Sequence, residues 1–122
     1  MDITELHDNR LIVEASREDL RILEIALRAG KVVDQSLRHA FDDETDKLHR
    51  MVELGLSDMH GKAVALALSQ RQLLNMSSIV GAVNTMDPEL FFPSMTDEFP
   101  SDDDLDTFSR HIEDLYDKAF NR

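Results

Sequence analysis

Two stretches of the chain place a short apolar run directly in front of a helix start. Leu11 to Ala15 contains β-branched residues and predicts a strand, and Ser16 follows it at the position of a helix N-cap. Asp19 lies three residues after Ser16, which is close to the capping-box pattern, and leucines then recur at helical spacing. Gly30 is expected to end the helix. The stretch therefore predicts a strand that passes through a cap into a helix.

The same order returns at an offset of 53 residues (69 − 16). Val64 to Leu68 forms the second apolar run, Ser69 takes the cap position, and Gln72 completes a full capping box. A strand needs a partner for its backbone donors and acceptors, so we expect these two strands to pair with each other. Pairing across a homodimer would enlarge the sheet.

The tails of the two stretches also correspond. An amphipathic helix is expected from Asp43 or Thr45 to Gly55, and a second is expected to begin after Ser101. We therefore predict an α+β, mostly helical fold, built as a tandem β-α-α repeat with two short pairing strands and about four helices packed in one layer. The half-units would be 9–55 and 62–120. The alternative is that any two strand–helix segments look alike at this level of pattern.

The length and the residue types limit the kind of protein. A chain of 122 residues is one domain, 1–122, and is long enough to bury a core without metals or disulfides. It contains no cysteine, which excludes disulfides and thiolate chemistry. No apolar run reaches the roughly 18 residues of a membrane span, and the charged first residues lack the apolar core of a secretory signal. We therefore expect a cytoplasmic protein without membrane contact.

The charge is strongly negative and unevenly distributed. The net charge is −12, of which residues 1–86 carry −4 (14 acids, 10 bases) and residues 87–122 carry −8 (11 acids, 3 bases). Such a surface repels nucleic-acid phosphates and favours basic proteins or cations, so direct nucleic-acid binding is not expected. The alternative is that the charge serves solubility alone.

One acidic motif has the ligand spacing of a calcium loop. Asp102, Asp104 and Asp106, followed by Glu113, match the oxygen ligands of an EF-hand. Thr107 occupies the position where that loop needs glycine for its sharp turn. A helical stripe of apolar residues also runs through the motif, so we interpret the aspartates as first-turn residues of a helix. No metal site is expected here.

Other chemistry is weakly indicated. Histidine and aspartate occur three times at helical spacing, as Asp46 with His49, His39 with Asp42, and His111 with Asp114. A lone pair of this kind is more often a surface histidine beside an acid than a metal or catalytic site. The chain contains no nucleophile elbow, phosphate-binding glycine loop or zincin motif. We therefore expect neither an enzyme nor a cofactor.

The segment of residues 86–106 combines prolines, acids and phenylalanines. Its aromatic side chains either seal the core or form an acidic-rimmed apolar patch for a partner. The leading hypothesis is a small acidic, non-enzymatic protein-binding module, of the inhibitor, immunity or anti-defence type, which docks on a basic protein surface. Its expected contact residues are Phe91, Phe92, Asp97, Glu98, Phe99, Asp102, Asp103, Asp104 and Asp106.

The alternative hypothesis is a structural or assembly subunit. From Met59 to Met86 the only formal charges are those of Lys62 and Arg71, and small residues such as Gly81 would allow close approach of a second helix. A homodimer would then form through the helix 69–86. A central core helix would explain the same pattern without a dimer.

Overall fold

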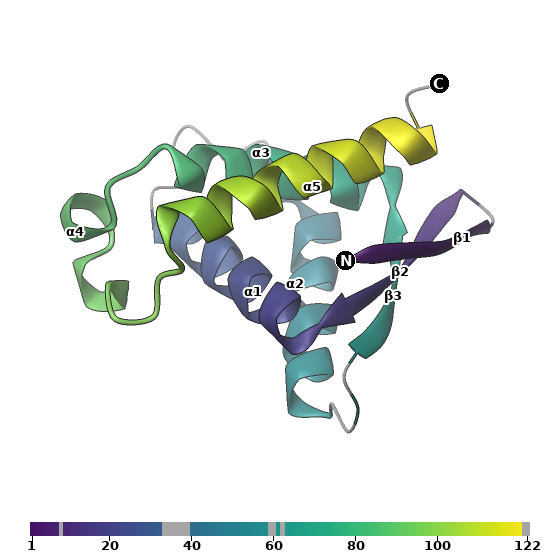
Figure 1. Ribbon diagram of the computed structural model, residues 1–122, viewed down its shortest axis with the longest axis horizontal. Coiled ribbons are helices and arrows are strands. Elements are labelled where there is room, and N and C mark those ends of the chain that lie inside the picture. Colours follow the sequence, from purple (N-terminus) through teal and green to yellow (C-terminus); the bar gives the residue numbers. More distant parts are fainter. Residues whose placement is uncertain (8, 33–39, 59–60, 62, 121–122) are drawn as a thin grey trace.

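The computed structural model describes residues 1–7, 9–32, 40–58, 61 and 63–120. Within these residues it contains a three-stranded antiparallel sheet and five α-helices. Figure 1 shows the sheet at one end of the molecule, the short helix α4 at the other, and α5 running between them along α3. The predicted α+β, mostly helical class is confirmed.

The sheet has the strand order β1-β2-β3. The two predicted strands are β2 (Arg10–Ser16) and β3 (Ala63–Ser69), and they pair antiparallel along their whole length. The third strand, β1 (Asp2–His7), pairs antiparallel with β2. The prediction of two strands was therefore wrong. All six residues of β1 are exposed, so the strand shows little of the apolar pattern by which strands are recognised.

The connection between β1 and β2 is short. His7 pairs with Arg10, which leaves a two-residue connection between the strands. Asn9, in this connection, has a positive φ of 64°, a conformation that asparagine tolerates better than most residues. Two-residue hairpin turns require such conformations, so Asn9 is the local signal that marks this hairpin.

The long helices pack against one another on the inner side of the sheet. Helix α1 packs against α2 and α3, and α3 packs against α5. The inner faces of β2 and β3 contribute buried side chains such as Val13 and Leu68 to the core. The helices are α1 (Arg17–Val32), α2 (Asp43–Ser57), α3 (Gln70–Asn84), α4 (Pro88–Phe91) and α5 (Asp102–Phe120), with a 3-10 turn, η2 (Pro93–Met95), after α4.

Both predicted caps are present. The backbone N–H of Asp19 donates to Oγ of Ser16 at 3.1 Å, and the Ser16 N–H donates to the Asp19 carboxylate at 3.0 Å. Ser69 and Gln72 make the same two bonds at 3.1 and 2.9 Å. Each box satisfies donors that the first turn of a helix leaves unpaired.

A polar network joins the start of α2 to α3. The Asp42 carboxylate caps α2 by accepting from the Thr45 N–H at 3.2 Å, and it also accepts from Arg71 Nε at 2.9 Å and Asn75 Nδ2 at 3.0 Å. Asn75 is buried and donates in addition to Oγ1 of Thr45 at 2.9 Å. Desolvation raises the pKa of Asp42, but the bonds from Arg71, Thr45 and Asn75 outweigh it and hold that pKa below its usual value.

Two expected helix ends lie elsewhere. Helix α1 continues through Gly30 to Val32, and α2 continues past Gly55 to Ser57. Gly30 is buried, and a Cβ at this position would come within 3.0 Å of Ile79 on α3. Gly30 therefore serves the close packing of two helices and does not end one.

Candidate protein-binding surface

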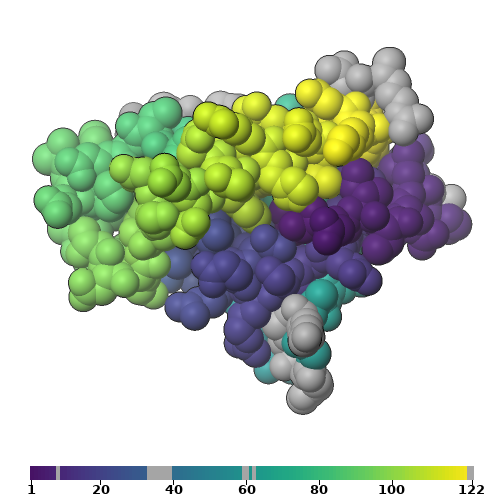
Figure 2. Space-filling model, viewed as in Figure 1, coloured from purple at the N-terminus to yellow at the C-terminus, as the bar shows by residue number. Residues whose placement is uncertain are grey.

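The chain between α3 and α5 gives its phenylalanines different environments. Phe92 is 1% exposed and stacks on Phe99 with ring centroids 5.4 Å apart, and both pack on the core. Phe91 is 44% exposed, and its neighbour Leu90 is 72% exposed. Figure 2 shows this segment, in green, forming one end of the molecule. Phe92 and Phe99 thus seal the core, while Phe91 is exposed.

The acidic residues of the segment also divide. Asp97 is exposed, whereas Glu98 accepts two bonds from the Arg28 guanidinium at 3.1 and 3.0 Å. This pairing lowers the pKa of Glu98 and raises that of Arg28, which also contacts Glu24 at 3.0 Å. Glu98 therefore fastens the segment to α1.

The aspartates at the start of α5 lie in a helix, as expected. Ser101 Oγ accepts from the Asp104 N–H at 3.2 Å, and the helix runs from Asp102 through Glu113. A continuous helix cannot form the loop of an EF-hand. Asp106 pairs with Arg110 at 2.9 Å and accepts from Asn84 at 3.3 Å, while residues 102–104 are exposed.

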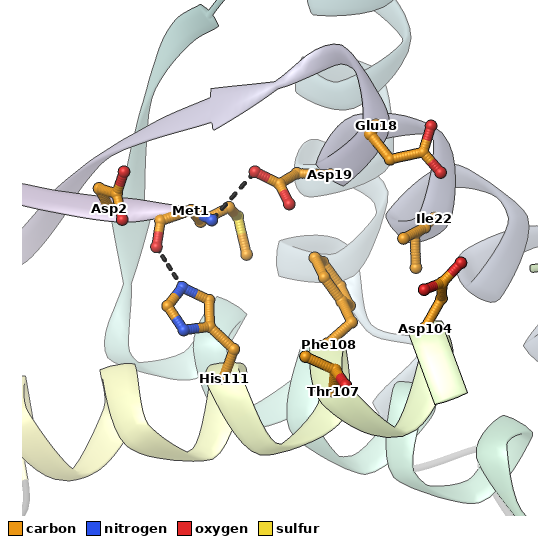
Figure 3. Close-up of a pocket in the computed structure, with 9 residues that line it drawn as sticks. All are labelled: Met1, Asp2, Glu18, Asp19, Ile22, Asp104, Thr107, Phe108 and His111. Carbon is orange, nitrogen blue, oxygen red and sulfur yellow. Dashed lines mark hydrogen bonds and ion pairs between the residues drawn. The ribbon is translucent and has the colours of Figure 1, made fainter. Parts of the chain in front are cut away.

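A hollow of about 360 Å³ lies between the first turns of α1 and α5 (Figure 3). Its walls carry four carboxylates, and its apolar lining includes Ile22 and Phe108. The carboxylates come from β1, α1 and α5 and belong to Asp2, Glu18, Asp19 and Asp104. The sequence placed acids in the first turns of both helices, but only the tertiary fold brings the two turns together.

Two polar contacts close the side of the hollow nearest the sheet (Figure 3). The α-ammonium of Met1 lies 2.9 Å from the Asp19 carboxylate, and the Met1 carbonyl oxygen contacts Nε2 of His111. Burial raises the pKa of Asp19, but the ammonium and Ser16 lower it by more, so the net pKa is depressed. Asp19 is consequently paired with a positive charge, whereas Asp2, Glu18 and Asp104 make no ion pair with another residue that lines the hollow.

The histidines noted in the sequence find other partners in the part of the chain that is described. His49 lies 3.0 Å from Glu53 and 3.7 Å from Glu24, and His111 contacts the first residue. His39 lies outside the described residues. In the described residues no group of three or more His, Cys, Asp or Glu side chains is arranged to hold a metal ion.

The weakly charged helix α3 is a central element of the core. Leu73, Met76 and Val80 are fully buried, whereas Leu74 is 43% exposed. A Cβ at Gly81 would meet no atom within 4 Å, so this side of the helix is open. The core position explains the apolar composition of α3, and a homodimer through it stays a prediction.

Comparison of the chain with protein-family models, with curated proteins and with solved structures finds no match. Among the described residues, none of the helices combines the length and the apolar character needed to cross a membrane.

Proposed function

We propose that this protein is a small, non-enzymatic module of the inhibitor, immunity or anti-defence type that binds a basic protein. Its docking surface comprises the hollow between α1 and α5, the exposed aspartates 102–104 and the exposed Phe91. The cysteine-free composition fits the reducing cytoplasm in which we place it.

The observation that carries the proposal is the chemistry of the hollow. Its carboxylates suit the charged head of an arginine or lysine side chain, and Ile22 and Phe108 suit the methylene stem of the same side chain. The N-termini of α1 and α5 each contribute a partial positive charge of about half a unit. Their sum is smaller than the negative charge of Asp2, Glu18 and Asp104, the three carboxylates that the Met1 ammonium does not contact.

The exposed apolar pair Leu90 and Phe91 adds the second part of the surface. Acidic Glu89 and Asp97 lie in the same segment and are exposed. Aromatic side chains in an apolar centre with a polar rim are typical of binding hot spots. Carboxylates around such a centre speed the encounter with a basic partner, and the aromatic contact then slows dissociation.

The test is capture of a basic protein at low salt by the wild-type chain and by a variant with Asp102, Asp103 and Asp104 all changed to Asn. Asp106 is left intact because it pairs with Arg110. The matched control removes three negative charges elsewhere, through Glu5→Gln, Glu113→Gln and Asp114→Asn at exposed positions. We expect the first variant to lose the partner and the control to retain it, with binding that weakens as salt is added.

A separate variant tests the hollow itself. Thr107 is exposed at its wall, so Thr107→Arg would place a guanidinium of the chain's own in the hollow and block a partner's side chain. Circular dichroism checks that each variant is folded. The proposal would be refuted if the basic protein were captured equally well by wild type, by Thr107→Arg and by the aspartate variant. Binding that does not weaken with added salt would refute it as well.

We also infer that the two half-units 9–55 and 62–120 arose as a tandem repeat. The offset of 53 residues equates Val13 with Leu66 (13 + 53), and these two residues pair directly across β2 and β3. A twofold relation between equivalent strands requires such a register, which supports the repeat. Strand β1 lies outside both half-units, and the positions equivalent to α4 lie outside the described residues.

A further inference from the structure

The two edges of the sheet differ in how they are protected. Strand β1 forms one edge, where it carries the charged residues Asp2 and Glu5 and a register shift between Ile3 and Glu5. Charges and bulges of this kind are the usual means by which proteins prevent further strands from pairing with an edge. Strand β3 forms the other edge, and its sequence AVALALS contains no charge and no proline. Its register with β2 runs without a bulge from Ala63 to Ser69.

An apolar hollow lies along the unprotected edge. It has a volume of about 320 Å³ and lies between β3 and the last turns of α2, with Met51, Leu54 and Val64 among its lining residues. Leu54 is 61% exposed although it is a large apolar side chain. In the residues that the structure describes, no strand pairs with the outer side of β3. An unpaired strand edge and an exposed apolar side chain thus lie together, which is the arrangement that β-strand addition uses.

We propose that β3 pairs with β3 of a second copy of this chain, antiparallel about Leu66, to form a continuous six-stranded sheet. The sequence of β3 is nearly palindromic about Leu66, so Ala65 would face Ala67, Val64 would face Leu68, and Ala63 would face Ser69 of the second copy. Like-sized side chains would therefore meet at every pair.

The low charge of this edge favours a second copy as its occupant. Two molecules of net charge −12 repel each other, but β3 itself is uncharged. On α2, the surface around Leu54 includes the oppositely charged Arg50 and Glu53. A twofold axis perpendicular to the sheet also places the helices of both copies on the same side of the sheet. The exposed Leu54 of each copy would then help to cover the apolar hollow of the other copy.

The first measurement is the mass of the wild-type chain by sedimentation or light scattering. We expect twice the 13.9 kDa of one chain. A wild-type chain that stays monomeric at about 100 µM would overturn the proposal, since a dimer of biological strength would be populated there.

Charges introduced on β3 then test the geometry. Ala65 and Ala67 lie on the face of β3 away from the buried Leu66 and Leu68, so the double variant A65K/A67K would place lysines opposite lysines at two symmetric pairs. We expect its dimer dissociation constant to rise about tenfold or more, with the same effect for A65E/A67E. A mixture of the two variants should recover the heterodimer, which a merely misfolded chain could not do.

Two further variants distinguish the interface from others. Leu54→Glu changes an exposed helix position and should weaken the dimer without unfolding the chain. Gly81→Arg, on the open side of α3, should leave the mass unchanged. A dimer that is dissociated by Gly81→Arg but not by the β3 variants would place the interface on α3 and refute the pairing of β3.

Discussion

The packing of α1 on α3 can be tested by making one substitution at two glycines. Gly30 lies two residues before the end of α1 (32 − 30) and Gly81 lies three before the end of α3 (84 − 81), so both are in last turns. Replacing glycine by alanine in a helix gains up to about 1 kcal/mol, and this gain should be similar at both sites. A Cβ at Gly30, however, would lie 2.9 Å from Cζ of Phe41 and 3.0 Å from Cγ2 of Ile79, whereas Gly81 has open space.

The difference between the two variants therefore isolates the cost of close packing. Ile79 is fully buried, and Phe41 is partly buried against the core, so both neighbours are packed where the new methyl group would lie. Overpacking a core costs about 1–3 kcal/mol. We expect Gly81→Ala to raise the free energy of unfolding by up to about 1 kcal/mol. Gly30→Ala should be less stable than Gly81→Ala by about 1–3 kcal/mol.

The assay is urea denaturation followed by circular dichroism at one fixed chain concentration, with wild type alongside. An unchanged dependence on denaturant would show that the same unfolding reaction is compared in each case. Equal gains in stability at both positions would refute the inference that Gly30 is needed for helix contact.

Three further predictions concern charged groups. Asp42→Ala should lower the free energy of unfolding by about 1–3 kcal/mol, because it removes a helix cap and the hydrogen bonds from α3. The control is Asp43→Ala at the exposed neighbouring position, which should lower it by about 0.5 kcal/mol or less in the same denaturation assay. Because the folded pKa of Asp19 is depressed, its contribution to stability is present above its unfolded pKa of about 3.9 and is lost as the pH falls through the folded value. Asp19→Asn should therefore flatten the loss of thermal stability below about pH 4, and an unchanged acid profile would contradict this. Arg28→Ala should lower the free energy of unfolding by about 1 kcal/mol or less, since its pair with Glu98 is largely exposed. It should nevertheless speed amide hydrogen exchange in residues 93–99. Unaltered exchange there would show that Glu98 does not fasten the segment.

Local chemistry made part of the fold predictable from the sequence. Ser16 and Ser69 act through bonds to residues three positions away, so a short stretch contains all that their caps require. The apolar runs before them are buried on one face of the sheet and show it in their residue types. The start of α5 after Ser101 was predictable for the same reason.

Features that depend on distant contacts were not predictable. Strand β1 is exposed and is held by its pairing with β2, so its own residues show little apolar pattern, and only the turn at Asn9 marks it. Gly30 has the residue type of a helix end, but Phe41 and Ile79 decide its role. Phe91 and Phe92 are adjacent and chemically identical, and only the fold determines that one is buried. The acidic hollow combines three separate elements, which no local pattern could bring together.

The contact between Met1 and His111 joins positions 110 residues apart, and this separation has a consequence for the order of folding. The β1–β2 hairpin involves only neighbouring residues and can form early, whereas its first residue finds its partners on α1 and on the last helix. Contacts of such long range form only after the chain between them has been ordered, since their loop-closure entropy is otherwise uncompensated. Met1 would therefore be among the last residues to be fixed in place, after the hairpin next to it has formed.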